Sequence, residues 1–289
     1  MVVSYGIPKC WFSRCSTQPA YFILLAVVTA MGIPTRDGIV QADDTPVNSI
    51  NYAYASWIGT GYYKIDDRYI YVLRGPFSYT LQEADSKNWG LKLLFPVTVG
   101  LNEFDGEYED IALVSLVPGI KLIYPVKENW WLKPFLQVGV GKDFSGGDPT
   151  CIWGVGTKSL ATFPCKDIEF DLGNSLMLAD NSRSGEQFGD DGFSMWEIGL
   201  NVRKPIDFRV RNRETHLSLF FVYTAFLNKL EFTQDLADDT RISRLYKLGV
   251  ALGGKDAFSI LGLGFSGVGI DYTFGKDFTG IGLTTGFPF

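Results

Sequence analysis

Apolar residues alternate with small or polar residues over long stretches of the chain, and residues 89–102 show this pattern most fully. In WGLKLLFPVTVGLN every odd position from Trp89 to Leu101 is apolar, whereas the even positions include Gly90 and Lys92. Successive side chains of a strand point to opposite faces, so one face of this segment is wholly apolar. Its fourteen residues exceed the length of most globular strands. They are enough for a membrane-spanning strand, which needs about 9–11.

The same alternation returns in residues 110–124, 131–143, 194–203 and 242–252. Their second face carries mostly small residues with single charges, which suits the crowded lumen of a narrow barrel better than the surface of a soluble sandwich. The sequence therefore predicts an all-β fold, a transmembrane antiparallel β-barrel. The predicted strands are 49–63, 68–82, 88–102, 110–125, 130–144, 151–163, 167–180, 192–206, 214–230, 240–253, 257–273 and 277–289. A bulge is expected near Gly267, where the alternation changes phase.

Cys151 and Cys165 bear on the number of strands. If residues 151–163 span the membrane, the two cysteines lie roughly 40 Å apart, which is too far for a disulfide. If they are bonded, residues 145–191 form a loop and the barrel has 10 strands. Both chain ends on one side of the membrane require an even count, and we favour about 12 strands.

The first forty-two residues have the features of a signal peptide. Lys9 and Arg14 precede an apolar run, Ala20 to Ile33, and a small-residue cleavage site ends at Ala42, with Ala30 as a competing site. The apolar run is shorter than the roughly 20 residues of an anchoring helix. We therefore expect residues 1–42 to be a signal peptide and residues 43–289 to form an outer-membrane β-barrel domain.

Aromatic residues gather near the ends of the predicted strands. They are Tyr62, Tyr63, Tyr69, Tyr71, Trp89, Trp130, Trp131, Tyr272 and Phe274. Such girdles lie at the lipid headgroups in membrane barrels, although sheets of all kinds are enriched in Tyr and Phe. Export and a barrel fold together predict the outer membrane of a Gram-negative bacterium, with outer-membrane lipid, lipopolysaccharide, the barrel-assembly machinery and periplasmic chaperones as partners. The net charge of −6 argues against a nucleic-acid partner.

Three segments resemble solitary autotransporter-like barrels, which are translocator-type barrels without a passenger. They are WLKPFLQVGVGKDF (131–144), DDGFSMWEIGLNVRKPI (190–206) and YVLRGPFSYTL (71–81). An autotransporter would have a long passenger and a pore-threading helix ahead of the barrel. Only about DDTPVN separates Ala42 from the first predicted strand. The resemblance implies a passenger-less barrel with a structural or narrow-channel, porin-like role, and no established activity.

The end of the chain resembles the C-terminal assembly signal of bacterial outer-membrane proteins. The last predicted strand places Ile281, Leu283, Phe287 and Phe289 on one face. The resemblance implies that the assembly machinery reads Phe287 and Phe289.

One pair of residues raises the alternative of a lipid-modifying barrel enzyme. His216 is the only histidine of the chain, and Ser218 lies two residues later on the same face of the strand, where a His is able to activate a Ser. The pair resembles the His-x-Ser of the outer-membrane lipid A deacylase, and Glu214 shares its face. His216 is expected at the periplasmic end of its strand, however, so we favour a polar residue near a turn and no enzymatic activity.

Inward-facing charges form a second candidate site. The basic residues are Arg74, Lys92, Lys121, Lys133, Arg203 and Lys247, and the acidic ones are Asp143, Glu169, Asp171, Glu197 and Asp271. Unpaired buried charge is costly, so such groups usually pair and close a small lumen. In a porin they line the water path and set ion preference. We favour a mainly closed lumen over conduction.

Two acidic stretches, residues 180–192 and 232–241, fall on the extracellular side by strand order. They are candidates for binding divalent cations or a partner, which would make the chain a surface-binding barrel, although solvated loops are the simpler expectation. One histidine and two cysteines after Ala42 provide no metal-ligand spacing, and no metal or other cofactor is expected.

Overall fold

The computed structural model describes residues 52–66, 68–104, 107–143, 149–183, 192–210, 213–232, 240–260 and 263–289. All of them belong to one compact unit, Val47–Phe289. The predicted signal peptide, residues 1–42, lies outside the described residues, as does most of each acidic stretch.

The described residues form one short helix and thirteen β-strands. These are α2 (Tyr52–Trp57), β1 (Thr60–Ile65), β2 (Arg68–Gln82), β3 (Gly90–Phe104), β4 (Glu107–Leu116), β5 (Gly119–Lys127), β6 (Trp130–Asp143), β7 (Thr150–Cys165), β8 (Ile168–Arg183), β9 (Phe193–Val210), β10 (Arg213–Phe232), β11 (Thr240–Ile260), β12 (Leu263–Gly275) and β13 (Phe278–Thr284). No helix among them is long and apolar enough to cross a lipid bilayer.

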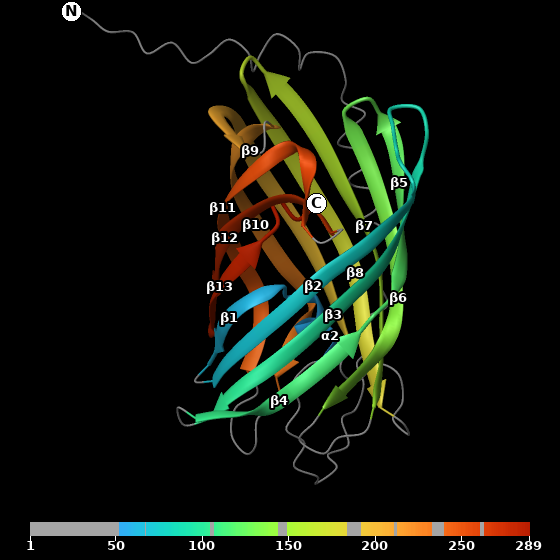
Figure 1. Ribbon diagram of the computed structural model, residues 1–289. Coiled ribbons are helices and arrows are strands. Elements are labelled where there is room, and N and C mark those ends of the chain that lie inside the picture. The colour runs from blue at the N-terminus through green and yellow to red at the C-terminus, as the bar shows by residue number, and fades with distance from the viewer. Residues whose placement is uncertain are drawn as a thin grey trace, which may run out of the picture. The chain divides into compact units, whose positions relative to one another are not determined.

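The strands close into an antiparallel barrel, as Figure 1 shows. Each barrel strand pairs with its neighbours in sequence, and β13 pairs with β1 to complete the ring. β4 and β5 both lie between β3 and β6, so they are two halves of one spanning strand that is interrupted at Val117 and Pro118. The thirteen segments therefore make twelve barrel strands, and the predicted all-β barrel of about 12 strands is confirmed.

The two faces of the strands follow the predicted alternation. On β10, Leu219 and Phe221 are 60% and 39% exposed on the outside, whereas Phe220 between them is 2% exposed on the inside. The outer face of β3 carries Phe95, while Thr98 on its inner face is 1% exposed. Large apolar side chains thus cover the outside of the barrel, and the interior has its own packing.

Cys151 and Cys165 lie at opposite ends of β7 and are not joined by a disulfide. Fourteen residue steps separate them along a strand, roughly 45 Å at the usual rise per residue. The prediction that residues 151–163 form a barrel strand, with the cysteines near its opposite ends, is confirmed, and the ten-strand alternative is wrong.

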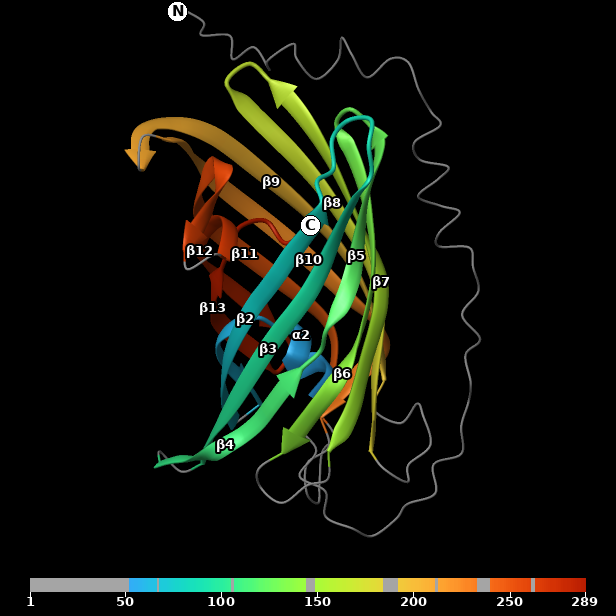
Figure 2. The same ribbon diagram turned by 45° about the vertical axis from the view of Figure 1, so that its right-hand side comes forward.

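The predicted first strand, 49–63, is wrong over most of its length. Tyr52–Trp57 forms the helix α2 inside the barrel, and only Thr60–Ile65 pairs as β1. Figure 2 shows α2 within the ring of strands. The interior therefore holds a segment that the sequence assigned to its wall. Tyr63, which was predicted in an outer aromatic girdle, faces inward and is 2% exposed.

The predicted last strand, 277–289, is also wrong at its end. β13 stops at Thr284, and Gly286 adopts a positive φ of 126°, a backbone conformation that only glycine reaches without strain. Ile281 and Leu283 face outward as predicted, but Phe287 and Phe289 lie inside the barrel.

The boundary between β11 and β12 differs from the prediction too. Residues 254–256 were expected to connect two strands, yet β11 continues through them to Ile260. The pairing with β12 shifts register between Gly253 and Phe258 on β11, opposite the stretch from Phe265 to Gly267. The irregularity therefore lies beside Gly267, as expected, but its extra residues belong to β11 and not to β12, the strand that contains Gly267.

An apolar core fills one half of the interior around α2. The Tyr54 ring makes edge contacts with Phe193 and Phe226, with ring centroids 5.7 and 5.6 Å apart. The Ser56 hydroxyl lies 2.8 Å from that of Ser115 on β4. The side chains packed here include Ile152, Met177, Leu230 and Ile242, all at most 1% exposed. Buried apolar side chains and α2 therefore fill this part of the lumen.

We expect Phe226→Ala to lower the free energy of unfolding by about 3–5 kcal/mol, because it leaves a cavity between Tyr54 and Phe193. The measurement is equilibrium unfolding of the refolded barrel in urea with detergent micelles. Leu219→Ala is the control, because it lies on the same strand and faces outward. Equal losses in both variants would contradict the packed interior.

Candidate functional site in the barrel lumen

The barrel has two distinct ends. The proximal end is where the connections β2–β3, β5–β6 and β7–β8 lie and where β13 stops; the distal end is where the connections β8–β9 and β10–β11 lie. The apolar core with α2 occupies the distal part of the lumen, since Ile152 begins β7 and Phe193 begins β9 at that end. The charged side chains gather toward the proximal end.

The last residues of the sequence lie in the proximal lumen. Lys158 Nζ on β7 donates a hydrogen bond to the Pro288 carbonyl oxygen at 2.7 Å, and Lys133 Nζ on β6 donates one to the Phe289 oxygen at 3.2 Å. The segment Thr285–Phe289, which we call the C-terminal segment, is thereby held against the barrel wall.

Two glycines on neighbouring strands make room for the aromatic rings of this segment. A Cβ atom on Gly173 of β8 would overlap the Phe289 ring, and one on Gly199 of β9 would lie 2.6 Å from a Phe289 carbon. The Phe287 and Phe289 rings pack on each other at 4.9 Å, and Phe287 also contacts Phe220 at 6.0 Å between centroids. The C-terminal segment is therefore docked by shape as well as by hydrogen bonds.

Four inward lysines form what we call the lysine cluster: Lys92, Lys121, Lys133 and Lys158. Lys92 on β3 lies directly opposite Lys121 on β5, and Lys133 on β6 lies directly opposite Lys158 on β7. Lys158 was absent from the sequence-based candidates. Strict alternation along 151–163 would have found it, since Gly154 and Gly156 share its face.

The lysine cluster lacks Asp and Glu side chains as ion-pair partners. Within the described ranges, no Asp or Glu oxygen lies within ion-pair distance of its four ammonium groups. Glu197 attracts Lys158, and Asp171 attracts Lys133, only from beyond ion-pair distance. Arg74 extends the positive charge: one of its terminal nitrogens donates to the Trp57 carbonyl at 3.3 Å, while its buried Nε makes no hydrogen bond to any described residue.

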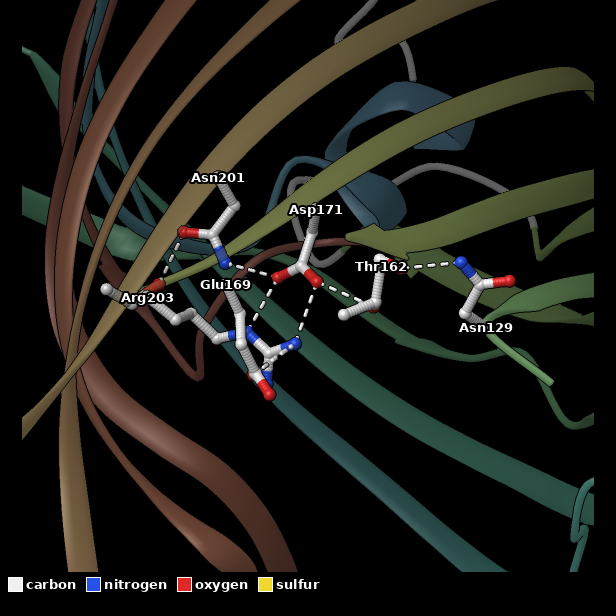
Figure 3. Close-up of polar contacts among 7 residues, drawn as sticks. Asn129, Thr162, Glu169, Asp171, Asn201 and Arg203 are labelled. Atoms are coloured by element: carbon white, nitrogen blue, oxygen red, sulfur yellow. Dashed lines mark hydrogen bonds and ion pairs between the residues drawn. The ribbon is translucent and has the colours of Figure 1, made fainter. Parts of the chain in front are cut away.

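The neighbouring part of the proximal wall carries a satisfied polar network, which Figure 3 shows. Asp171, 3% exposed, accepts hydrogen bonds from Arg203 Nε and Nη2 at 2.7 Å each. The Asn201 amide and the Thr162 hydroxyl also donate to this carboxylate, at 2.8 and 2.7 Å. Glu169 completes the network with an ion pair to Arg203 at 3.1 Å. This buried carboxylate is therefore fully engaged in holding β7, β8 and β9 together.

Further inward charges have partners of their own. Lys247 Nζ lies 3.6 Å from Asp271, and Glu197 accepts a hydrogen bond from the Thr224 hydroxyl at 3.2 Å. The side chain of Asp143 lies outside the described residues. Charge pairing thus holds for Arg203 and Lys247 but not for the lysine cluster.

His216 and Ser218 lie on one face of β10 near its proximal start, next to this network. The Ser218 hydroxyl donates to the Asn201 side-chain oxygen at 2.6 Å. Among the described residues, no hydrogen bond joins the His216 ring to Ser218. The serine proton is thus held by Asn201 in a structural contact.

No group of three or more His, Cys, Asp or Glu side chains with metal-binding geometry occurs in the described part of the chain. The acidic stretches 180–192 and 232–241 lie mostly outside it, so their proposed binding role stays a prediction.

No protein-family model matches the chain, and no curated protein matches it. Among solved structures, the β domain of the Bordetella autotransporter BrkA is similar, with a TM-score of 0.49 and 14% sequence identity. The match covers 77% of this chain and 91% of that chain. The closed twelve-strand architecture rests on the strand pairing of this chain itself.

We expect Gly173→Ala to displace the C-terminal segment, because the new methyl group occupies the place of the Phe289 ring. Hydrogen–deuterium exchange of the terminal peptide should lose its protection in this variant. Gly100→Ala is the matched control: it also lies on an inward face, but its Cβ would meet Leu113 at 3.5 Å, an ordinary contact. Unchanged protection in Gly173→Ala would contradict the docking of Phe289.

Proposed function

We propose that the chain is an integral outer-membrane β-barrel of a Gram-negative bacterium, of the passenger-less autotransporter-like type. The observation that supports this is the outer surface, where large apolar side chains are exposed on nearly every strand, with exposed fractions from 37% to 65%. A soluble barrel would not present so continuous an apolar surface to water. Lipid is the environment that matches such a surface, and a closed ring leaves no unpaired strand edge in it.

The proximal end would face the periplasm and the distal end the outside of the cell. Aromatic rings support a membrane location, since outward-facing rings contact each other in two groups, Tyr62 with Tyr71 on β1 and β2, and Tyr246, Tyr272 and Phe274 on β11 and β12. Rings of this kind sit at the lipid headgroups of membrane barrels. Residues 1–42 would act as the signal peptide, and lipopolysaccharide, periplasmic chaperones and the barrel-assembly machinery would be the partners.

The barrel would be structural and closed at rest, not an open porin-like channel. Two segments of its own chain support this: α2 packs in the distal lumen, and the C-terminal segment packs in the proximal lumen. The buried apolar side chains around α2 support a closed lumen. An ion passing them would lose its hydration without polar compensation.

The test is single-channel recording of residues 43–289, refolded and reconstituted in planar bilayers. We expect a silent membrane from protein whose heat-modifiable gel mobility shows that the barrel is folded. Lys133→Ala serves as a second sample, because it removes a lumen charge without touching the apolar core. Discrete conductance steps in the parent chain, with an ion preference that shifts in Lys133→Ala, would show an open channel and refute the closed barrel.

The lipid-modifying alternative is tested separately. We expect no release of fatty acid from lipopolysaccharide by the refolded protein, because the Ser218 hydroxyl is bound to Asn201. Ser218→Ala should cost about 1–3 kcal/mol of stability, because it leaves the buried Asn201 side-chain oxygen without a hydrogen-bond donor. Fatty-acid release that disappears in both Ser218→Ala and His216→Ala would make the chain an enzyme.

A further inference from the structure

The lysine cluster is the feature of the lumen that a purely structural barrel does not need. Its four side chains come from four strands that follow one another around the wall, β3, β5, β6 and β7. Each of the two facing pairs joins like charges on directly opposed residues, whose Cβ atoms lie roughly 5 Å apart. Such an arrangement destabilises the sheet, whereas the nearby Arg203 network shows that this wall also accommodates well-paired charges.

The cluster already binds oxygen atoms on one side. Lys133 and Lys158 both direct their ammonium groups at oxygens of the C-terminal segment. Lys92 and Lys121 have no hydrogen-bond acceptor among the described residues, and both side chains are half-buried. The unused donors of this second pair, together with Arg74, mark the free part of the cluster.

We propose that the lysine cluster is a binding site for a phosphate-type anion, held by Lys92 and Lys121 with Lys133, Lys158 and Arg74 adding positive charge. A phosphate group fits these residues because it offers several acceptor oxygens and more than one negative charge, while each lysine acts as a compact charge with three donors. A metal cation would be repelled by the same groups. The anion would enter from the proximal end, where β3 begins and β5 ends.

This chemistry is shared by soluble phosphate compounds and by phospholipid headgroups. The proposal does not depend on the membrane location or on the closed state, since it concerns only the inner wall of the folded barrel. Binding can therefore be measured in detergent, where failure of the proposed function would not affect the result.

The experiment is titration of the refolded barrel with inorganic pyrophosphate by isothermal calorimetry at low ionic strength. We expect saturable binding that weakens as NaCl is raised, because salt screens partly exposed charges. Lys121→Met should weaken binding at least tenfold, whereas Lys121→Arg should largely retain it. Lys204→Ala is the control, since it removes one positive charge from the exposed outside of β9 and should bind like the parent.

A second readout separates a binding role from a structural one. Without ligand, Lys121→Met should unfold at a higher urea concentration than the parent, because it relieves repulsion from Lys92 and Lys158. A purely structural lysine would give the opposite change. Higher stability together with weaker binding would support the site. Absence of pyrophosphate binding by the parent, or equal binding by Lys121→Met and the parent, would overturn it.

A competition experiment distinguishes a soluble phosphate compound from a phospholipid headgroup as the natural ligand. Short-chain phosphatidic acid, below its micelle concentration, is added to the pyrophosphate-loaded barrel. Displacement of pyrophosphate would identify a site open to lipid headgroups, and its retention would identify a site for soluble phosphate compounds. Both results require that pyrophosphate binds first, so the pyrophosphate titration is the test of the proposal itself.

Discussion

Six residue pairs between β1 and β13, from Thr60–Leu283 to Ile65–Phe278, close the sheet into a ring. β1 is the shortest barrel strand, and the seam it forms is correspondingly short. Tyr63 reinforces it from inside: its ring lies over Gly280, and its hydroxyl lies 3.3 Å from the Ile58 carbonyl oxygen as a hydrogen-bond donor. A side chain at Gly280 would overlap this ring. Without the seam, the sheet would present an unpaired strand edge.

Because the seam is short, packing inside the barrel must contribute part of the stability of the closed ring. In a wide barrel the lumen is wet and the wall is stabilised by strand pairing alone. Here apolar side chains fill the distal lumen, and α2 brings Tyr54 into contact with β9 and β10 on the side of the ring away from the seam. The helix leads directly into β1, so its packing also anchors the strand that closes the barrel. The closure of the barrel and the filling of its lumen therefore depend on the same segment, α2 and β1.

The sequence predicted most of the wall because strand alternation is a local property. Long segments with one apolar face leave a single way to orient each strand, so the boundaries of β2, β6 and β8 differ from prediction by at most a few residues. The two largest errors lie at the ends of the barrel domain, where the surroundings decide the conformation. Residues 52–57, YAYASW, alternate as a strand does, but Phe193 and Phe226 provide a site for Tyr54 that no local pattern reveals.

The C-terminal error has a different physical origin. Phe287 and Phe289 continue the alternation of the last strand, and the outer surface would have accepted them. The departure begins at Gly286, whose positive φ turns the chain, and Pro288 has no N–H with which to continue the ladder. Both signals can be read from the local sequence. The site that receives the Phe289 ring cannot, since Gly173 and Gly199 lie far away in the chain.

The two charged regions of the proximal lumen differ in how completely they are satisfied, and the difference links the C-terminal segment to the proposed anion. Asp171 meets a charged side-chain partner in Arg203, whereas Lys133 and Lys158 meet backbone oxygens of Phe289 and Pro288. An anion held by Lys92 and Lys121 would compete with these oxygens for the ammonium groups of Lys133 and Lys158. By linkage, the factor by which the anion weakens the docking of the segment is also the factor by which the docked segment weakens anion binding.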